Sequence, residues 1–409
     1  MPAVVDQKYP LVPDGPLGSL VHPFRLELIR LGFTPHTAQD NAYVLACLSR
    51  WMGRAGLAVE ELGPAELERF VARRRELEYR RWLSVRSLGK MLVFLRGAGA
   101  IPAPPPPAPL DPVTVLLEEF GAYLLRERRL SAATIALQQL MNRRFLRFLS
   151  SDGGLCLDRL GPDLLIEFIS AQRGVYAASS MKRLTCARRS FLRFMFAIGR
   201  AETDLSTAVP SVAGWRLGPL PVAAGDDVLP ALLASCDRGG GVGVRDFAVL
   251  MLMAGLGLRA IEISRLRLQD VHWRTGQITV RGKGGRIDRM PLPAEVGAAI
   301  AEYLERGRRP SVCREVFLRH FGPDAPASRQ AIVSVPRRAA ERAGIAMVGA
   351  HRLRHRMACR VLADGGNLAE IAQLLRHQSH ETTAIYAKID MASLAAPVRP
   401  WPGAEAGTR

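Results

Sequence analysis

A proline-rich stretch, IPAPPPPAPLDP at residues 101–112, limits what this chain can fold into more than any other feature. Consecutive prolines lack backbone N–H donors and fix φ, so the stretch is excluded from helix and sheet interiors and is expected to form an extended spacer. A second stretch, VPSVAGWRLGPLP at residues 209–221, mixes proline and glycine in the same way. Because 409 residues are more than one ordinary hydrophobic core accommodates, the two breaks are predicted to separate domains.

These breaks predict a division of the chain into three domains joined by two linkers. Hydrophobic residues make up 48% of the sequence, which is enough for each domain to bury a core. The predicted regions are an N-terminal extension (1–17), a helical bundle (18–100), a linker (101–112), a second helical bundle (113–208), a linker (209–225), a C-terminal domain (226–395) and a tail (396–409).

The first two domains repeat each other's pattern. An apolar stripe at helical spacing, Val44, Leu48, Trp51 and Met52, recurs at Met141, Phe145, Phe148 and Leu149. The segment LGPAELERFVARRR (62–75) is echoed by LGPDLLIEFISAQR (160–173), and each LGP precedes a helix-period pattern. Both domains are therefore interpreted as small helical bundles. Duplication is one explanation of their likeness, and the alternative is the general similarity of amphipathic helices.

The charge balance points to a polyanionic partner. The formal net charge is +18, which favours nucleic acid over an acidic membrane surface. The longest apolar run, VLMLMAGLGL (249–258), is far shorter than the roughly 20 residues of a membrane span, and the N-terminus lacks a signal-peptide core. The six cysteines are scattered without a CxxC pair, as is typical of reduced intracellular proteins. We therefore expect a cytoplasmic protein without a membrane partner.

One segment of the second bundle concentrates cations without any carboxylate. MKRLTCARRSFLRFMFAIGR (181–200) is predicted to form a helix that buries Leu184, Phe191 and Phe194 and presents its cations to DNA phosphates. The alternative is a solvated helix face, which is common for charge runs. The candidate DNA-binding residues are Lys182, Arg183, Arg188, Arg189 and Arg193.

The C-terminal domain has a different pattern, which predicts a mixed α+β fold. A helix over 246–255 is followed by two strand-like runs, QITVRG (277–282) and RIDRMPLP (286–293), joined through the glycines of GKGG (282–285). Glycines at such a junction favour a hairpin turn. The predicted fold class is thus multidomain and mainly α, with a small antiparallel sheet in the C-terminal domain.

Histidines in this domain raise the question of a zinc site. His351 and His355 are spaced i, i+4 on one helical face, and His377 and His380 follow. The HExxH pattern, however, requires glutamate where Arg352 stands. Arginines in the same helix would oppose a metal's charge, so we predict no metal and favour an anion site.

An anion site would use residue types that this domain supplies. Arg259 and Arg354 offer planar, permanently charged forks that match phosphate oxygens. Lys283 stands on the glycine-flanked hairpin tip, and only five residues of the whole chain are lysines. A lysine can donate a proton, which arginine effectively cannot, although chance placement is an alternative. Tyr386 is a candidate nucleophile, and its alternative is a half-buried core residue.

The successive motifs GLGLRAIEISRL, VRGKGGRIDRMPL, HRLRHRMA and LLRHQSHETTAIYAKI resemble those of the tyrosine recombinase (phage integrase) family. The second bundle resembles the family's SAM-like core-binding domain, and the first bundle is interpreted as its copy. The resemblance implies six catalytic residues, present here in the family's order: Arg259, Lys283, His351, Arg354, His377 and Tyr386.

The resemblance implies a mechanism for these residues. Tyr386 would attack a scissile DNA phosphate, form a 3′-phosphotyrosine link and free a 5′-hydroxyl. The two arginines would hold the non-bridging oxygens, and Lys283 would protonate the departing 5′-oxygen. The two histidines would assist by hydrogen bonding and proton transfer. Glu262, one helical turn after Arg259, is a supporting candidate for orienting that guanidinium.

The family resemblance also implies partners. It implies a homotetramer on two double-stranded DNA sites, with related recombinases as further candidate partners, and no metal, ATP or other cofactor. We expect an integrase or transposase of a mobile element. The alternatives are a type IB topoisomerase-like nicking–closing enzyme, which shares the chemistry without synapsis, and a catalytically inactive DNA-binding regulator.

Arg376 departs from the family pattern, because members usually carry glycine immediately before the second histidine of the site. If that position requires a positive φ, arginine introduces backbone strain. If it does not, Arg376 is free to add a phosphate contact. His380 is interpreted as a polar helix residue or DNA contact, and His355 as structural.

Overall fold

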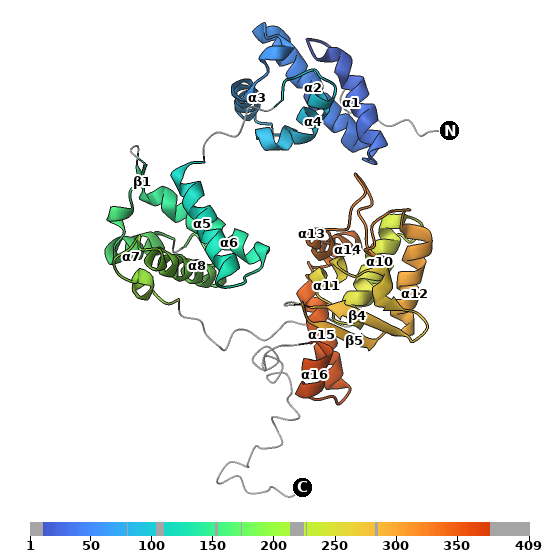
Figure 1. The fold of residues 1–409 in the computed structure, drawn as a ribbon. Coiled ribbons are helices and arrows are strands. Elements are labelled where there is room, and N and C mark those ends of the chain that lie inside the picture. The colour runs from blue at the N-terminus through green and yellow to red at the C-terminus, as the bar shows by residue number, and fades with distance from the viewer. Residues whose placement is uncertain are drawn as a thin grey trace, which may run out of the picture. The chain divides into compact units, whose positions relative to one another are not determined.

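The computed structural model describes most of the chain (Figure 1), namely residues 11–79, 81–103, 110–151, 154–172, 174–212, 225, 227–282 and 285–376. Contacts divide the chain into two compact units, 103–218 and a second that combines 1–102 with 219–409. Each boundary between the units falls in one of the two proline-containing breaks, whose central residues lie outside the described part.

The described part of the first bundle has four α-helices around its own buried cluster, in which Phe24, Leu45 and Leu95 are almost fully inaccessible. The helix α3 begins at Pro64 of the LGP motif, with Gly63 as an extended N-cap. Proline suits this first helical position because its missing N–H has no intrahelical acceptor there. The helices are α1 (Gly18–Arg30), α2 (Pro35–Ala55), α3 (Pro64–Glu76) and α4 (Gly89–Gly97).

The second bundle has the same order of helices, as the internal echo predicts. Its third helix also begins at the proline of LGP, Pro162, after the extended Gly161. Phe145 and Leu149 of the repeated stripe are buried, whereas Phe148 remains 40% exposed. The elements are α5 (Pro112–Arg126), α6 (Ala132–Leu149), the short strands β1 (Ser150–Ser151) and β2 (Gly154–Leu155), α7 (Pro162–Ala171) and α8 (Ala178–Ala197).

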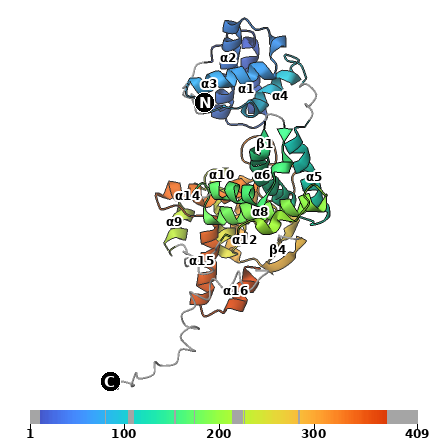
Figure 2. The same ribbon diagram turned by 90° about the vertical axis from the view of Figure 1, so that its left-hand side faces the viewer.

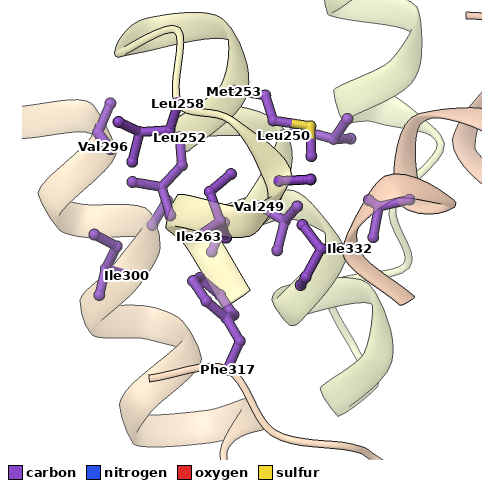
Figure 3. Packing of buried hydrophobic residues seen from close by; sticks show 14 of the residues in the cluster. Val249, Leu250, Leu252, Met253, Leu258, Ile263, Val296, Ile300, Phe317 and Ile332 are labelled. Atoms are coloured by element: carbon purple, nitrogen blue, oxygen red, sulfur yellow. The ribbon is translucent and has the colours of Figure 1, made fainter. Parts of the chain in front are cut away.

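The C-terminal domain is built around α10 (Gly241–Gly255), whose apolar side chains pack against the neighbouring helices in the domain core (Figure 3). Within the described part of the chain, no helix is both long enough and apolar enough to span a membrane. The other described helices are α9 (Val228–Ala234), α11 (Ala260–Ser264), the 3-10 turn η5 (Leu268–Asp270), α12 (Ala294–Glu302), the π-helical turn η7 (Tyr303–Gly307), α13 (Arg329–Val333), α14 (Val335–Ala343), α15 (Ala350–Ala363) and α16 (Leu368–Leu374).

A three-stranded antiparallel sheet completes this domain, in the order β3 (Val271–His272), β4 (Gln277–Arg281) and β5 (Ile287–Pro291). β4 and β5 pair in register from Gln277↔Pro291 to Arg281↔Ile287, which confirms the predicted pair of strands. The strand β3 was not predicted, because two residues are too short for a recognisable alternation of apolar and polar side chains. The small sheet and the helical remainder confirm the predicted fold class.

The last described elements, α15 and α16, follow each other directly and pack together (Figure 2). Their contact is a small apolar cluster of Ala358, Ile371 and Leu375, all buried. Leu375, the C-cap of α16, belongs to this cluster, so the cluster fixes the position of the chain immediately before Arg376.

Candidate active site

Arg259 stands at the N-cap of α11, immediately after the loop that leaves α10. The loop turns at Gly257, whose φ is +57°, and a Cβ at this position would lie 2.8 Å from Leu375 Cδ2. The left-handed backbone is what favours glycine here, whereas the methyl group of Leu375 lies at the end of a flexible side chain that could shift. The guanidinium side chain of Arg259 keeps 35% of its surface accessible, which leaves one face open to an anion.

Glu262 lies in the first turn of α11 with its side chain 1% exposed. Its Oε2 accepts the backbone N–H of Arg259 at 2.8 Å, and its Oε1 accepts a bond from Arg259 Nη1 at 2.9 Å. One carboxylate therefore caps the helix and holds the arginine side chain at the same time.

Arg354 lies on α15 and is only 5% exposed. Its Nη1 donates to the carbonyl oxygen of Gly257, and its Nη2 donates to that of Leu375. These bonds connect α15 to the loop before Arg259 and to the residue before Arg376. Because a charged donor to a buried carbonyl is a strong hydrogen bond, Arg354 fixes the relative positions of three segments distant in sequence.

His351 lies one turn before Arg354 on α15 and is exposed. Partial burial of its ring lowers the pKa of His351, and the positive charges of Arg354, Arg259 and Arg329 lower it further. At neutral pH the imidazole is therefore held in its neutral form, which both donates and accepts a hydrogen bond.

Arg376 follows α16 with a φ of +53°, in the left-handed region. This is the first of the two alternatives drawn from the sequence: the position does require a positive φ, and arginine is strained there. The side chain is buried and bonds Glu262 Oε2 through Nη2 at 2.7 Å. The second alternative, a phosphate contact, was tied to a position without positive φ, and in this structure the side chain forms a buried ion pair.

Three of the six candidate catalytic residues, Lys283, His377 and Tyr386, lie outside the described residues, as does His380. The described three, Arg259, His351 and Arg354, are brought into one neighbourhood by the loop after α10 and by α15. Within the described residues this neighbourhood is cationic, because Arg259, Arg354 and Arg376 gather around the carboxylate of Glu262, which pairs with Arg259 and Arg376. It can hold a phosphate oxygen and stabilise charge that develops on it.

The cations of α8 divide into two groups, and one predicted DNA contact is wrong. Lys182, Arg183 and Arg193 are exposed, and Arg189 is half-buried with Nη2 bonded to the carbonyl of Val209 at 2.9 Å. Arg188, in contrast, is 1% exposed. A side chain without accessible surface cannot contact a phosphate in this structure. The prediction that Arg188 contacts DNA is therefore wrong for the structure described.

Arg188 instead packs inside the second bundle. Its guanidinium lies 3.7 Å from the ring centroid of Phe145 and 5.1 Å from that of Phe168, and Nη1 bonds Asn142 Oδ1 at 2.6 Å. Burial lowers the pKa of Arg188 strongly. The sequence held a signal for this: Arg188 lies four residues after Leu184 and three before Phe191, on the same apolar stripe.

Family profiles match two parts of the chain. The profile described as "Phage integrase family" matches residues 225–393, and the one described as "Phage integrase, N-terminal SAM-like domain" matches residues 117–199. The chain is 34% identical over 396 residues to the putative integrase/recombinase y4rA of Sinorhizobium fredii, covering 96% of both chains. It is 30% identical over 284 residues to the tyrosine recombinase XerD of Listeria monocytogenes, covering 67% of this chain and 94% of the relative.

Solved structures share the fold at low sequence identity. XerH site-specific recombinase bound to palindromic difH substrate has a TM-score of 0.54 at 19% identity, covering 71% of this chain and 97% of its own. A lambda integrase dimer bound to a core site has a TM-score of 0.54 at 15% identity, covering 72% and 99%.

The family matches define the class of protein as a DNA strand-cleaving and rejoining enzyme. The chain belongs to the tyrosine recombinase (phage integrase) family, as its resemblance to the family's motifs predicts. It is a tyrosine-type site-specific recombinase.

Proposed function

We propose that this recombinase serves a mobile element, as an integrase or transposase, and cuts and rejoins DNA through a covalent 3′-phosphotyrosine intermediate formed by Tyr386. The observation that carries the proposal is the joint placement of Arg259 and Arg354 around the loop that ends α10. Similarity to a putative integrase/recombinase over 96% of the chain supports the mobile-element role.

In this mechanism the Tyr386 oxygen attacks the scissile phosphorus as the bond to the 5′-oxygen breaks. Arg259 and Arg354 bind the non-bridging oxygens and stabilise the negative charge that grows on them. Lys283 gives its proton to the leaving 5′-oxygen, so the strand departs as a 5′-hydroxyl. Rejoining reverses each step, and the phosphodiester energy is retained in the protein–DNA link.

The histidines complete the proposed site. His351, neutral at physiological pH, hydrogen-bonds the phosphate or accepts the tyrosine proton. His377 donates a further hydrogen bond to the phosphate. The reaction as written balances without a metal ion or ATP, and a homotetramer on two DNA sites would exchange the strands.

The test is covalent trapping on a nicked duplex that contains a DNA site bound by the full-length protein. The nick lets the short downstream fragment diffuse away, so the phosphotyrosine adduct accumulates. We expect the adduct to retain a 5′-label on the upstream strand, to form in the presence of a chelator, and to disappear in Tyr386→Phe.

Tyr303→Phe provides the matched control. Tyr303 is a buried tyrosine of the same domain, 2% exposed, whose hydroxyl accepts the backbone N–H of Leu318 at 3.2 Å. Its replacement is expected to leave the adduct intact. No adduct on a bound site would refute the enzymatic mechanism and favour the inactive regulator. An adduct with relaxation of supercoiled DNA but no exchange between two sites would favour the nicking–closing alternative.

A further inference from the structure

The backbone of Arg376 is unusual for its residue type. Four described residues other than glycine have positive φ, and Arg376 is the only buried one among them. The others, Glu78, Trp82 and Arg129, are exposed or half-buried. Glycine would adopt φ +53° without strain, so the reason for an arginine at this position must lie in its side chain.

That side chain is directed entirely into the protein. It is 5% exposed, and its ion pair with Glu262, at 2.7 Å between Nη2 and Oε2, bridges 114 positions of sequence. Its Nη1 donates to the carbonyl of Leu374 at 3.2 Å. Both terminal nitrogens therefore have acceptors inside the protein, and the positive charge of Arg376 lies against the Glu262 carboxylate.

Glu262 links Arg376 to Arg259. The oxygen that pairs with Arg376 also accepts the backbone N–H of Arg259, and the other oxygen accepts the Arg259 side chain. A carboxylate paired with Arg259 alone would cancel the charge of that arginine. With Arg376 present, the three groups together keep a net charge of one positive unit.

We propose that Arg376 is a positioning residue that acts through Glu262: it fixes the carboxylate that orients Arg259 and offsets its negative charge, so that Arg259 remains available to the scissile phosphate. This inference rests on the proposed function, because it assigns Arg259 to the phosphate. It accounts for retention of an arginine where a glycine would relieve strain.

The ionisation of Glu262 supports this role. Burial raises the pKa of Glu262, but the charge of Arg376, together with the hydrogen bonds and charge of Arg259, outweighs burial and lowers it. Arg259 at the N-cap of α11 and Arg376 after α16 are the charged groups that face the carboxylate. Removing Arg376 should therefore raise the pKa of Glu262 and let it protonate at a higher pH.

The test compares the full-length wild type with Arg376→Gly, Arg376→Lys, Glu262→Gln and the double variant Arg376→Gly/Glu262→Gln. The readouts are the single-turnover rate of adduct formation at saturating DNA and the dissociation constant for the same duplex. Arg376→Gly is expected to slow adduct formation about 10- to 100-fold, as misplacement of a transition-state group does, with little change in DNA affinity.

The pH profile separates positioning from a general structural effect. Arg376→Gly should move the acid limb of the rate profile to higher pH, and Arg376→Lys, which keeps the charge, should restore most of the wild-type limb. The double variant should lack the acid limb of the rate profile, because glutamine does not titrate. Its rate of adduct formation should be no lower than that of Glu262→Gln. A wild-type rate and profile in Arg376→Gly would overturn the proposal.

Two controls keep the outcome decisive. Arg129→Gly makes the same chemical change at φ +47° on an exposed residue and is expected to leave the rate unchanged. If the wild type forms no adduct, the proposed function fails, and a crystal structure of Arg376→Gly still decides this inference. There the Glu262 carboxylate, which has lost its bond to Arg376 Nη2, should leave its wild-type position and take the Arg259 side chain with it. A carboxylate and an Arg259 side chain that both keep their wild-type positions would overturn the inference.

Discussion

The second bundle and the C-terminal domain each bury arginines, but by different means. Arg188 is enclosed by two phenylalanine rings and one asparagine oxygen, and it forms no ion pair with any carboxylate in the described part of the chain. Arg354 and Arg376 are enclosed by carbonyl oxygens and by Glu262. The first arrangement fills a core, whereas the second fixes the positions of chain segments around an anion site.

This difference teaches that burial alone does not identify a functional arginine. The groups that surround the guanidinium distinguish the two regions. In the second bundle, aromatic rings surround the cation within one domain core. In the C-terminal domain, carbonyl oxygens and a carboxylate from separate elements bond to the cations, which therefore cross-link those elements. Removing the cation should therefore have different consequences in the two regions.

The largest effect is expected for Arg354→Met, which keeps much of the side-chain volume and removes the charge. The carbonyls of Gly257 and Leu375 lose their charged donors, so the free energy of unfolding should fall by about 3 kcal/mol. Loss of a phosphate ligand should also slow adduct formation by about 10²- to 10³-fold. Urea unfolding and the nicked-duplex assay measure the two effects.

Arg360→Met is the control on the same helix. Arg360 is exposed, and its Nε lies 3.7 Å from Asp364 Oδ2 on the surface. Its replacement should change stability by no more than about 0.5 kcal/mol. Equal stability of Arg354→Met and Arg360→Met would show that Arg354 does not cross-link these segments.

Local pattern was sufficient to predict much of the fold. Proline after LG marked the first residue of α3 and of α7, because the first helical position tolerates a residue without an N–H. The two strand-like runs within 277–293 and the glycines between them predicted β4 and β5. The resemblance of the motifs, not their periodicity, predicted the site residues.

Contacts between distant segments set the limit of that prediction. The role of Arg376 depends on Glu262, which lies 114 positions earlier in the sequence. A pattern of neighbouring residues cannot predict that these two side chains meet. The prediction for Arg188 failed for another reason. Its charge was given more weight than its place on the stripe of Leu184 and Phe191, although a long side chain stacked on aromatic rings can occupy such a place.

An intermediate effect is expected for Arg188, and it tests the packing role directly. Arg188→Ala leaves a cavity between Phe145 and Phe168 and should lower the free energy of unfolding by about 2 kcal/mol, without slowing the chemical step. Arg188→Met refills the space and removes a buried charge, so its stability should stay within about 1 kcal/mol of the wild type. Urea unfolding distinguishes the two. Comparable losses in both variants would mean that the charge, and not the volume, stabilises this core.

The smallest effect is expected for the exposed cations of α8, and it sharpens the comparison within a single helix. Lys182 and Arg193 are exposed, so if they neutralise DNA phosphates each removal should reduce the slope of log K against log [salt] by about 0.9. Binding of one fixed duplex over a salt series, with Lys182→Ala, Arg193→Ala and the double variant, measures this slope.

Two further variants of α8 and its C-terminal end locate the DNA-facing surface. Arg188→Met should leave the slope unchanged, because a buried guanidinium releases no counterion from DNA. Arg200→Ala should change it less than Lys182→Ala does, since Arg200 already pairs with Glu119 at 3.2 Å. If replacing Arg188 changed the salt slope as much as replacing Lys182 does, Arg188 would have to leave the phenylalanine rings when the bundle binds DNA. In that case the contrast between a packing arginine and a binding arginine would hold only for the free protein.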